Sequence, residues 1–144
     1  MNVMCMPLAS TLAVTRMILG GVWNRHPDLR LLVVHGGGYL PFYVARTDHA
    51  WKVRPELRHQ LDVPPSQVLK RIYVDTNVFD PHMVAHLVST LGADHVLMGT
   101  DYPFDMGPVD PVGFLAGVDL DRADRDRVLG GNAAQLFGID TGRG

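Results

Sequence analysis

Three short apolar runs in this sequence each end in polar or glycine residues. The runs cover residues 31–34, 72–74 and 95–99, and they lead into His35, Asp75 and the pair Thr100-Asp101. Such runs are typical of parallel strands that helices cover on both faces. The carboxyl ends of parallel strands meet at one edge of a sheet, where loops carry catalytic groups. The pattern therefore predicts an α/β fold with its polar residues gathered at that edge.

Helical patterns lie between these runs. Residues 8–23 have apolar positions at helical spacing and are expected to begin a helix just after Pro7. Residues 41–54 and 82–91 are the next predicted helices, the latter with Asp80 as its N-cap. Closing helices are expected over 112–116, 122–129 and 132–137, the last two divided at Gly130 and Gly131. This α-β-α-β-α-β-α order suits a doubly wound sheet or part of a (β/α)8 barrel.

The composition favours a soluble, cytoplasmic enzyme built as a single domain over residues 1–144. Hydrophobic residues make up 47% and charged residues 19% of the chain, and these proportions exclude a disordered protein. The net charge of -2 leaves no basic field for nucleic acid or an anionic membrane. The sequence starts without a basic leader. The run 8–23, of about 16 residues, is shorter than the roughly 20 apolar residues that a membrane span needs.

His35 and the three glycines after it are the first candidate site. The glycines allow a sharp turn and a close approach to a ligand. An imidazole fixed there can act as a general base or a metal ligand near neutral pH. The alternative is a core histidine that hydrogen-bonds to a backbone group, with the glycines serving only the turn.

Asp101 is the second candidate. It ends the third run inside the segment 99–104, before a rigid Tyr-Pro step, and is suited to bind a metal or accept a proton. The alternative is a turn in which its own side chain caps the loop. Residues 75–77 end the second run. They are interpreted mainly as capping and turn residues that line the pocket without reacting.

Arg46 is a candidate for substrate binding, because an arginine can hold a carboxylate through two hydrogen bonds. The alternative is a solvated helix face. His82 and His86 are four residues apart but have no acid between them, so they indicate a polar helix face and not a zinc site. Cys5, the only cysteine, has no evident base partner and no partner for an internal disulfide.

Several motifs, taken in order, resemble one family: the amidohydrolase-related decarboxylases typified by aminocarboxymuconate semialdehyde decarboxylase. The resemblance rests on residues 21–31, 35–38 with Pro41 and Arg46, 73–76, 99–104 and 131–134. It implies a distorted (β/α)8 barrel with one divalent metal, usually zinc. This chain would form the C-terminal part of that barrel, about three βα units.

The resemblance also implies roles for individual residues. Asp101 would bind the metal and take part in catalysis. His35 would act in acid–base catalysis. Arg46 would reach the neighbouring subunit's site and hold a substrate carboxylate, which makes a homodimer functional. The implied activity is a metal-dependent carboxy-lyase acting on a small unsaturated or aromatic carboxylic acid, with hydrolysis of a lactone or similar ring as the runner-up.

The sequence departs from this family in its metal ligands. It has no counterpart of the family's His-x-His pair, of a further histidine ligand, or of an early arginine. One ligand of four cannot hold zinc well. The chain is therefore expected to be a fragment: a truncated gene model, a partial read or a degraded gene. The non-catalytic alternatives are a half-barrel that assembles with a partner chain and a relic without activity. A small independent flavodoxin-like domain would need a phosphate-binding loop, which the sequence lacks.

Overall fold

The fold is built on a short parallel sheet. The computed structural model describes residues 2–140 and 142. Strands β1 (Leu32–Val33), β2 (Tyr73–Asp75) and β3 (Val96–Leu97) pair in the order β1-β2-β3, all parallel. Val33 is opposite Val74, and Val74 is opposite Val96. The chain is thus α/β with a parallel sheet, as the apolar runs predicted, and its strands end at one edge.

The strands are shorter than the apolar runs that predicted them. After β1, Val34 is still extended, but His35 has a φ of 60° and turns the chain away. Before β3, residues 93–95 form the 3-10 turn η2 (Ala93–His95), so His95 does not belong to the strand. Local hydrophobicity predicts the buried run, whereas hydrogen bonding to β2 sets how much of it is strand.

The first helix differs from the prediction at its start. Helix α1 spans Asn2–Leu19 and contains Pro7, which was expected to precede it. The fixed φ of proline is compatible with a helix, and its main cost there is one missing N–H bond and a tight contact with the preceding turn. The helical pattern continued to Trp23, but the helix ends at Leu19, because the glycines at 20 and 21 are weak helix formers. Gly21 has a φ of 66°, and the short helix α2 (Val22–Arg25) follows.

Helix α1 meets the length and composition criteria for a membrane span, which the run 8–23 had not met. It has 18 residues, and few of them are buried inside the fold. The same criteria are met by signal sequences and by core helices of soluble proteins, so the feature is weak evidence. In this fold, α1 contributes Val14 and Ile18 to the shared core.

The two central helices agree with the prediction. Helix α3 spans Leu40–Val53 and α6 spans Pro81–Leu91. The Asp80 carboxylate accepts a hydrogen bond of 2.7 Å from the His82 amide, as expected of an N-cap. Between α3 and β2 lie two one-turn helices, α4 (Pro55–Arg58) and α5 (Pro65–Leu69), each with proline as its first residue.

The predicted break at Gly130 and Gly131 is wrong. After α7 (Pro111–Ala116), helix α8 (Arg122–Asp126) continues through the π-helical turn η3 (Arg127–Gly131) into α9 (Asn132–Phe137). Gly131 has φ -56° and ψ -45°, which are helical values. Glycine permits a break but does not require one. The Val128 carbonyl accepts the Met98 amide at 2.9 Å, and this bond ties the turn to the end of β3.

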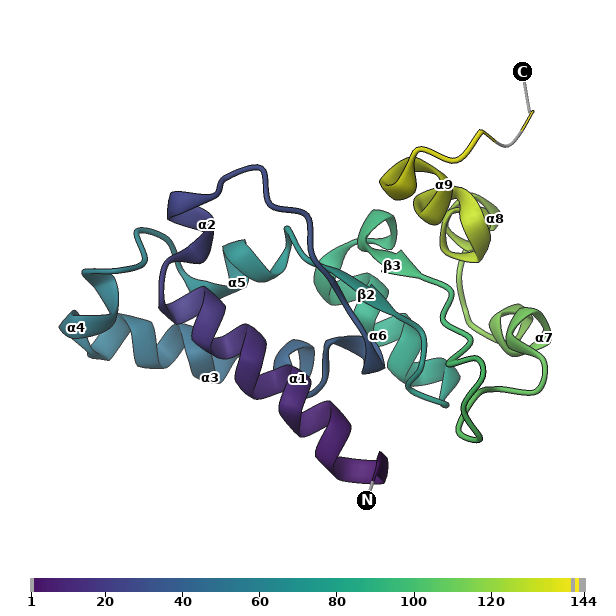
Figure 1. Cartoon of the computed structure of the whole chain (residues 1–144), viewed down its shortest axis with the longest axis horizontal. Coiled ribbons are helices and arrows are strands. Elements are labelled where there is room, and N and C mark those ends of the chain that lie inside the picture. Colours follow the sequence, from purple (N-terminus) through teal and green to yellow (C-terminus); the bar gives the residue numbers. More distant parts are fainter. Residues whose placement is uncertain (1, 141, 143–144) are drawn as a thin grey trace.

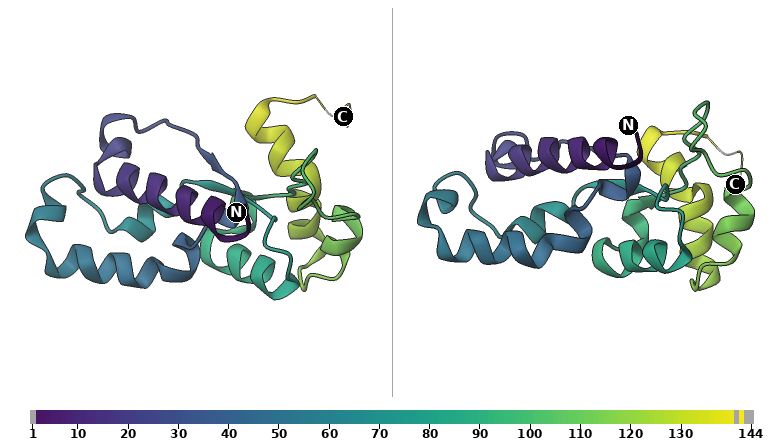
Figure 2. Two further views of the ribbon diagram at one scale, coloured as in Figure 1. Left: turned by 60° about the horizontal axis from the view of Figure 1, so that its bottom comes forward. Right: turned by 90° about the horizontal axis from the view of Figure 1, so that it is seen from below.

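Helices α1–α5 lie to one side of the sheet and α7–α9 to the other, and this separation holds in all views (Figures 1 and 2). Helix α6 packs against β3 and α3. One hydrophobic cluster joins these parts. Its fully buried members include Val74 and Val96 of the sheet, Val84 and Leu87 of α6, and Leu115 of α7.

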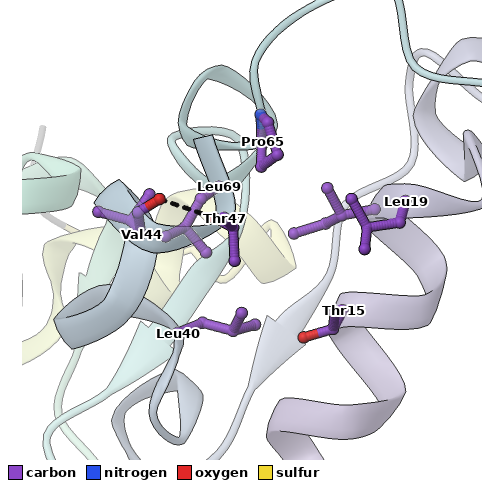
Figure 3. Close-up of a pocket in the computed structure, with 8 residues that line it drawn as sticks. Thr15, Leu19, Leu40, Val44, Thr47, Pro65 and Leu69 are labelled. Carbon is purple, nitrogen blue, oxygen red and sulfur yellow. Dashed lines mark hydrogen bonds between the residues drawn. The ribbon is translucent and has the colours of Figure 1, made fainter. Parts of the chain in front are cut away.

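A narrow gap separates α1 from α3 and α5. Thr15 and Leu19 face Leu40 and Thr47 across it, and Leu69 lies at its side (Figure 3). Its volume is about 10 Å³, roughly the space of one water molecule. The gap is therefore a packing feature and too small to be a ligand site.

Candidate active site

A cavity of about 260 Å³ opens where the strands end. Its polar lining consists of His35 after β1, Asn77 after β2 and Asp101 after β3, together with Asn2. Its apolar lining comes from α1 and from the loops after β2 and β3: Val3, Met6, Pro7, Phe79, Phe104 and Met106. The parallel strand order thus brings the two principal sequence-predicted site residues, His35 and Asp101, to one cavity.

His35 is held in a strained turn. It is half-buried, and its φ of 60° is uncommon for a residue with a side chain. The next residues, Gly36 and Gly37, also have positive φ values, of 61° and 78°. The ring nitrogen Nδ1 lies 3.3 Å from the Ser10 hydroxyl oxygen, on α1. His35 is thus not the core histidine of the alternative interpretation, because its ring partner is a side chain.

Asp75 fixes this turn from the neighbouring strand. Its carboxylate accepts the Gly36 amide at 2.7 Å and, through its other oxygen, the Asn77 side-chain amide at 3.0 Å. Asp75 is only 5% exposed. Burial raises the pKa of its carboxyl, and the backbone hydrogen bonds and the nearby His35 act in the opposite direction. Asp75 is thus a structural carboxylate behind the cavity wall.

Thr76 and Asn77 connect β2 to the third strand. The Thr76 hydroxyl accepts the Gly99 amide at 3.0 Å. The Asn77 carboxamide lies against Gly99 so closely that a Cβ there would come within 2.8 Å of it. The Asn77 oxygen Oδ1 is buried and has no hydrogen-bond partner among the described residues. Residues 75–77 therefore join all three strand ends, and Asn77 also lines the cavity, as the sequence analysis expected for this segment.

Asp101 has a carboxylate without a partner in the part of the chain that the structure describes. It is half-buried and has a φ of 52°. The turn after it is closed by its backbone carbonyl, which accepts the Phe104 amide at 2.8 Å. The alternative of a side-chain cap is thus not what the structure shows. The carboxylate remains available to an exogenous group in the cavity.

Arg46 does not join His35 and Asp101. It is exposed on α3 and lines a separate depression with His49, Ala50, Val53 and Arg54. Its guanidinium makes no hydrogen bond or ion pair with the residues that are described. Within one copy of the chain, Arg46 is therefore a residue of the outer surface.

A complete metal site is not present among residues 2–140 and 142. No three His, Cys, Asp or Glu side chains there are close enough to hold an ion together. Protein zinc sites have three or four protein ligands. Asp101 can supply one, so the described residues do not fit a full metal centre by themselves.

Most of the apolar cavity wall cannot be predicted from the sequence. Met6 lies on α1 and lines the cavity, and nothing in its own segment of the sequence indicates this. Phe79 and Phe104 belong to loops, where hydrophobic periodicity gives no information. None of these residues has a local signal, because each reaches the cavity only when α1 and the loops pack around the strand ends.

The fold and cavity define a class: an α/β chain with a parallel sheet and an acid and an imidazole at the carboxyl ends of its strands. A family model described as amidohydrolase matches residues 1–139. The chain belongs to the amidohydrolase family. It is 34% identical over 137 residues to a 2-amino-3-carboxymuconate-6-semialdehyde decarboxylase of Dictyostelium discoideum, a match that covers 94% of this chain and 38% of the relative.

A further relative and two solved structures are also similar to this chain. A gamma-resorcylate decarboxylase of Rhodococcus jostii is 29% identical, with 87% of this chain and 39% of the relative covered. Among solved structures, the 5-carboxyvanillate decarboxylase of Sphingomonas paucimobilis has a TM-score of 0.85 at 27% identity, over 93% of this chain and 41% of its own. A dihydroxybenzoic acid decarboxylase from Polaromonas, solved with manganese and 2-nitroresorcinol, has a TM-score of 0.79 at 25% identity, over 90% and 40%. The chain thus spans about two fifths of their length.

Proposed function

We propose that this chain forms part of the active site of a metal-dependent decarboxylase that acts on a small unsaturated or aromatic carboxylic acid. The observation that supports this most directly is the shared cavity of His35 and Asp101. The Dictyostelium and Rhodococcus relatives are decarboxylases by name. The apolar walls, with Phe79 and Phe104, suit a flat substrate whose polar end lies against the strand ends.

His35 is proposed to handle the proton of the reaction. Decarboxylation breaks the bond between a carbon atom and its carboxylate, CO2 leaves, and the electron pair left on the carbon takes up a proton. An imidazole is suited to deliver that proton near neutral pH. The strained turn of His35, fixed by Asp75, is the kind of preorganisation that such a role requires.

Asp101 is proposed to be one ligand of a divalent metal ion, zinc by the family resemblance. Its free carboxylate supports this role. Manganese is the ion in the Polaromonas structure, so the identity of the metal is a separate question for experiment. The other ligands would have to come from outside these 144 residues, in keeping with a chain that spans 38% of its Dictyostelium relative.

Arg46 is proposed to hold a substrate carboxylate in the site of a neighbouring subunit of a homodimer. Its exposure on α3 supports a role between subunits, since it is remote from its own chain's cavity lining. The three βα units are likewise proposed to be the C-terminal part of a (β/α)8 barrel within a single domain. Localisation in the cytoplasm stays a prediction from the sequence.

A chimera tests the proposed function. This chain would replace the matching segment of the Dictyostelium relative, and decarboxylation would be followed by CO2 release with zinc or manganese present. We expect activity in the chimera, loss of bound metal in Asp101→Ala, and retained metal with lost turnover in His35→Ala. The isolated chain, assayed in parallel, should be inactive and should bind metal weakly.

The matched control is His59→Ala, which removes an exposed histidine remote from the cavity lining and should leave turnover unchanged. Circular dichroism would verify that each chimera is folded. A folded His35→Ala chimera with near-normal turnover would refute the acid–base role. Full metal occupancy in Asp101→Ala would refute the ligand role.

A further inference from the structure

We propose that Ser10 is the positioning residue of His35: its hydroxyl holds the ring nitrogen Nδ1, so that Nε2 is the nitrogen presented to the cavity. The Ser10 oxygen lies 3.3 Å from Nδ1, and His35 lines the cavity. This inference rests on the acid–base role proposed for His35. An imidazole transfers protons efficiently only when a defined nitrogen atom faces the substrate.

The residues around Ser10 fix its helix against the His35 turn. The Thr11 hydroxyl accepts the Tyr39 amide at 2.8 Å and donates to the Pro7 carbonyl at 2.7 Å. Gly38 permits this close approach, because a Cβ there would collide with the Thr11 hydroxyl and the Pro7 carbonyl. Since the neighbouring residue Thr11 is anchored to the turn, the place of Ser10 beside the imidazole is set by the packing of α1.

The proposal also assigns the direction of the hydrogen bond between the Ser10 hydroxyl and the His35 ring. Thr11 donates its hydroxyl to a carbonyl one helical turn earlier, as helical serine and threonine often do. The partner of Ser10 among the described residues is instead the His35 ring. In the proposed arrangement Ser10 donates to Nδ1 of the neutral ring, which leaves the ring proton on Nε2. When the ring gains a second proton, the same oxygen can accept from Nδ1, because a hydroxyl both donates and accepts.

Nitrogen NMR of the imidazole tests this inference in the full 144-residue chain. The chain would be labelled with 15N and recorded over a series of alkaline pH values until the signals no longer change, and the His35 signals would be assigned by their loss in His35→Ala. We expect the wild type to show Nδ1 without a proton and Nε2 with one. In Ser10→Ala the two nitrogen shifts should move toward each other, because the tautomers then mix. Ser10→Thr should restore the wild-type shifts.

Ser89→Ala is the matched control. Ser89 is an exposed helical serine on α6 that bonds to a backbone carbonyl at 2.9 Å, so its loss should leave the His35 signals unchanged. Gly38→Ala is a second test of the positioning, because its Cβ would collide with Thr11 and Pro7 and displace α1. The two tautomers of His35 should then mix although Ser10 is still present. Identical His35 shifts in wild type and Ser10→Ala, or a wild-type proton on Nδ1, would overturn the proposal.

The outcome is separable from that of the proposed function. If Ser10 governs the tautomer but His35→Ala leaves turnover intact in the chimera, the positioning stands and the acid–base role fails. In the chimera, Ser10→Ala should lower kcat about tenfold with little change in KM, because it disorders the reacting ring and removes no substrate contact. A change confined to KM would count against positioning.

Discussion

Asn132 connects the closing helix α9 to the start of strand β3. Its substitution by alanine should lower the free energy of unfolding by much more than the substitution of an exposed asparagine. The residue is 3% exposed. Its side-chain nitrogen donates to the carbonyls of Ala93 and Val96, each at 2.7 Å. These two bonds fix η2 and β3 against α9, so Asn132→Ala perturbs packing on both sides of η2.

The expected magnitude follows from burial. Each hydrogen bond contributes about 0.5–1.5 kcal/mol net. The cavity left by the carboxamide adds about 1 kcal/mol, comparable to deleting a small buried group. Asn132→Ala should therefore lower the free energy of unfolding by about 2–4 kcal/mol, a large part of the 5–15 kcal/mol typical of a domain.

Urea denaturation followed by circular dichroism measures this difference, with Asn24→Ala as the matched control. The Asn24 side-chain nitrogen also donates two hydrogen bonds, to the Gln60 carbonyl and the Asp62 carboxylate, each at 3.1 Å, but it is exposed. The control should cost about 0.5 kcal/mol or less. Equal losses in the two variants would refute the reasoning that burial gives Asn132 its effect.

Further predictions concern the strand ends and the surface. Burial raises the pKa of the Asp75 carboxyl, so the stability that this group contributes is present below about pH 4 and declines as the pH rises through its folded-state pKa. Urea denaturation at several pH values should therefore show the wild type losing stability relative to Asp75→Asn as the pH rises. A difference that stays constant with pH would contradict this. Gly36→Ala should cost about 2–4 kcal/mol, because its φ is 61° and a Cβ would collide with Val78. Thermal unfolding would test this against Gly138→Ala, where φ is 66° but no neighbour is within reach and the cost should be about 1 kcal/mol. Arg46→Ala should raise the KM of the chimera about tenfold with little effect on kcat, and an unchanged KM would exclude the carboxylate contact.

Local pattern was sufficient for most of the elements. The three apolar runs and the Asp80 cap have signals within a few residues, and the structure has strands and a capped helix there. Boundaries were less accurate. The break expected at Gly130 is absent because helix packing against β3 outweighs the weak helix propensity of glycine.

The sequence alone predicts that His35 and Asp101 share an edge, because parallel strands point the same way and each residue follows an apolar run within a few positions. The surroundings of these two residues depend on how distant segments pack. Ser10 reaches the imidazole because α1 packs on the turn, and Arg46 is excluded from the cavity lining because α3 places it on the outer surface. The periodicity of a segment shows which face is buried, but contacts between distant segments depend on how the helices pack and have no local signal.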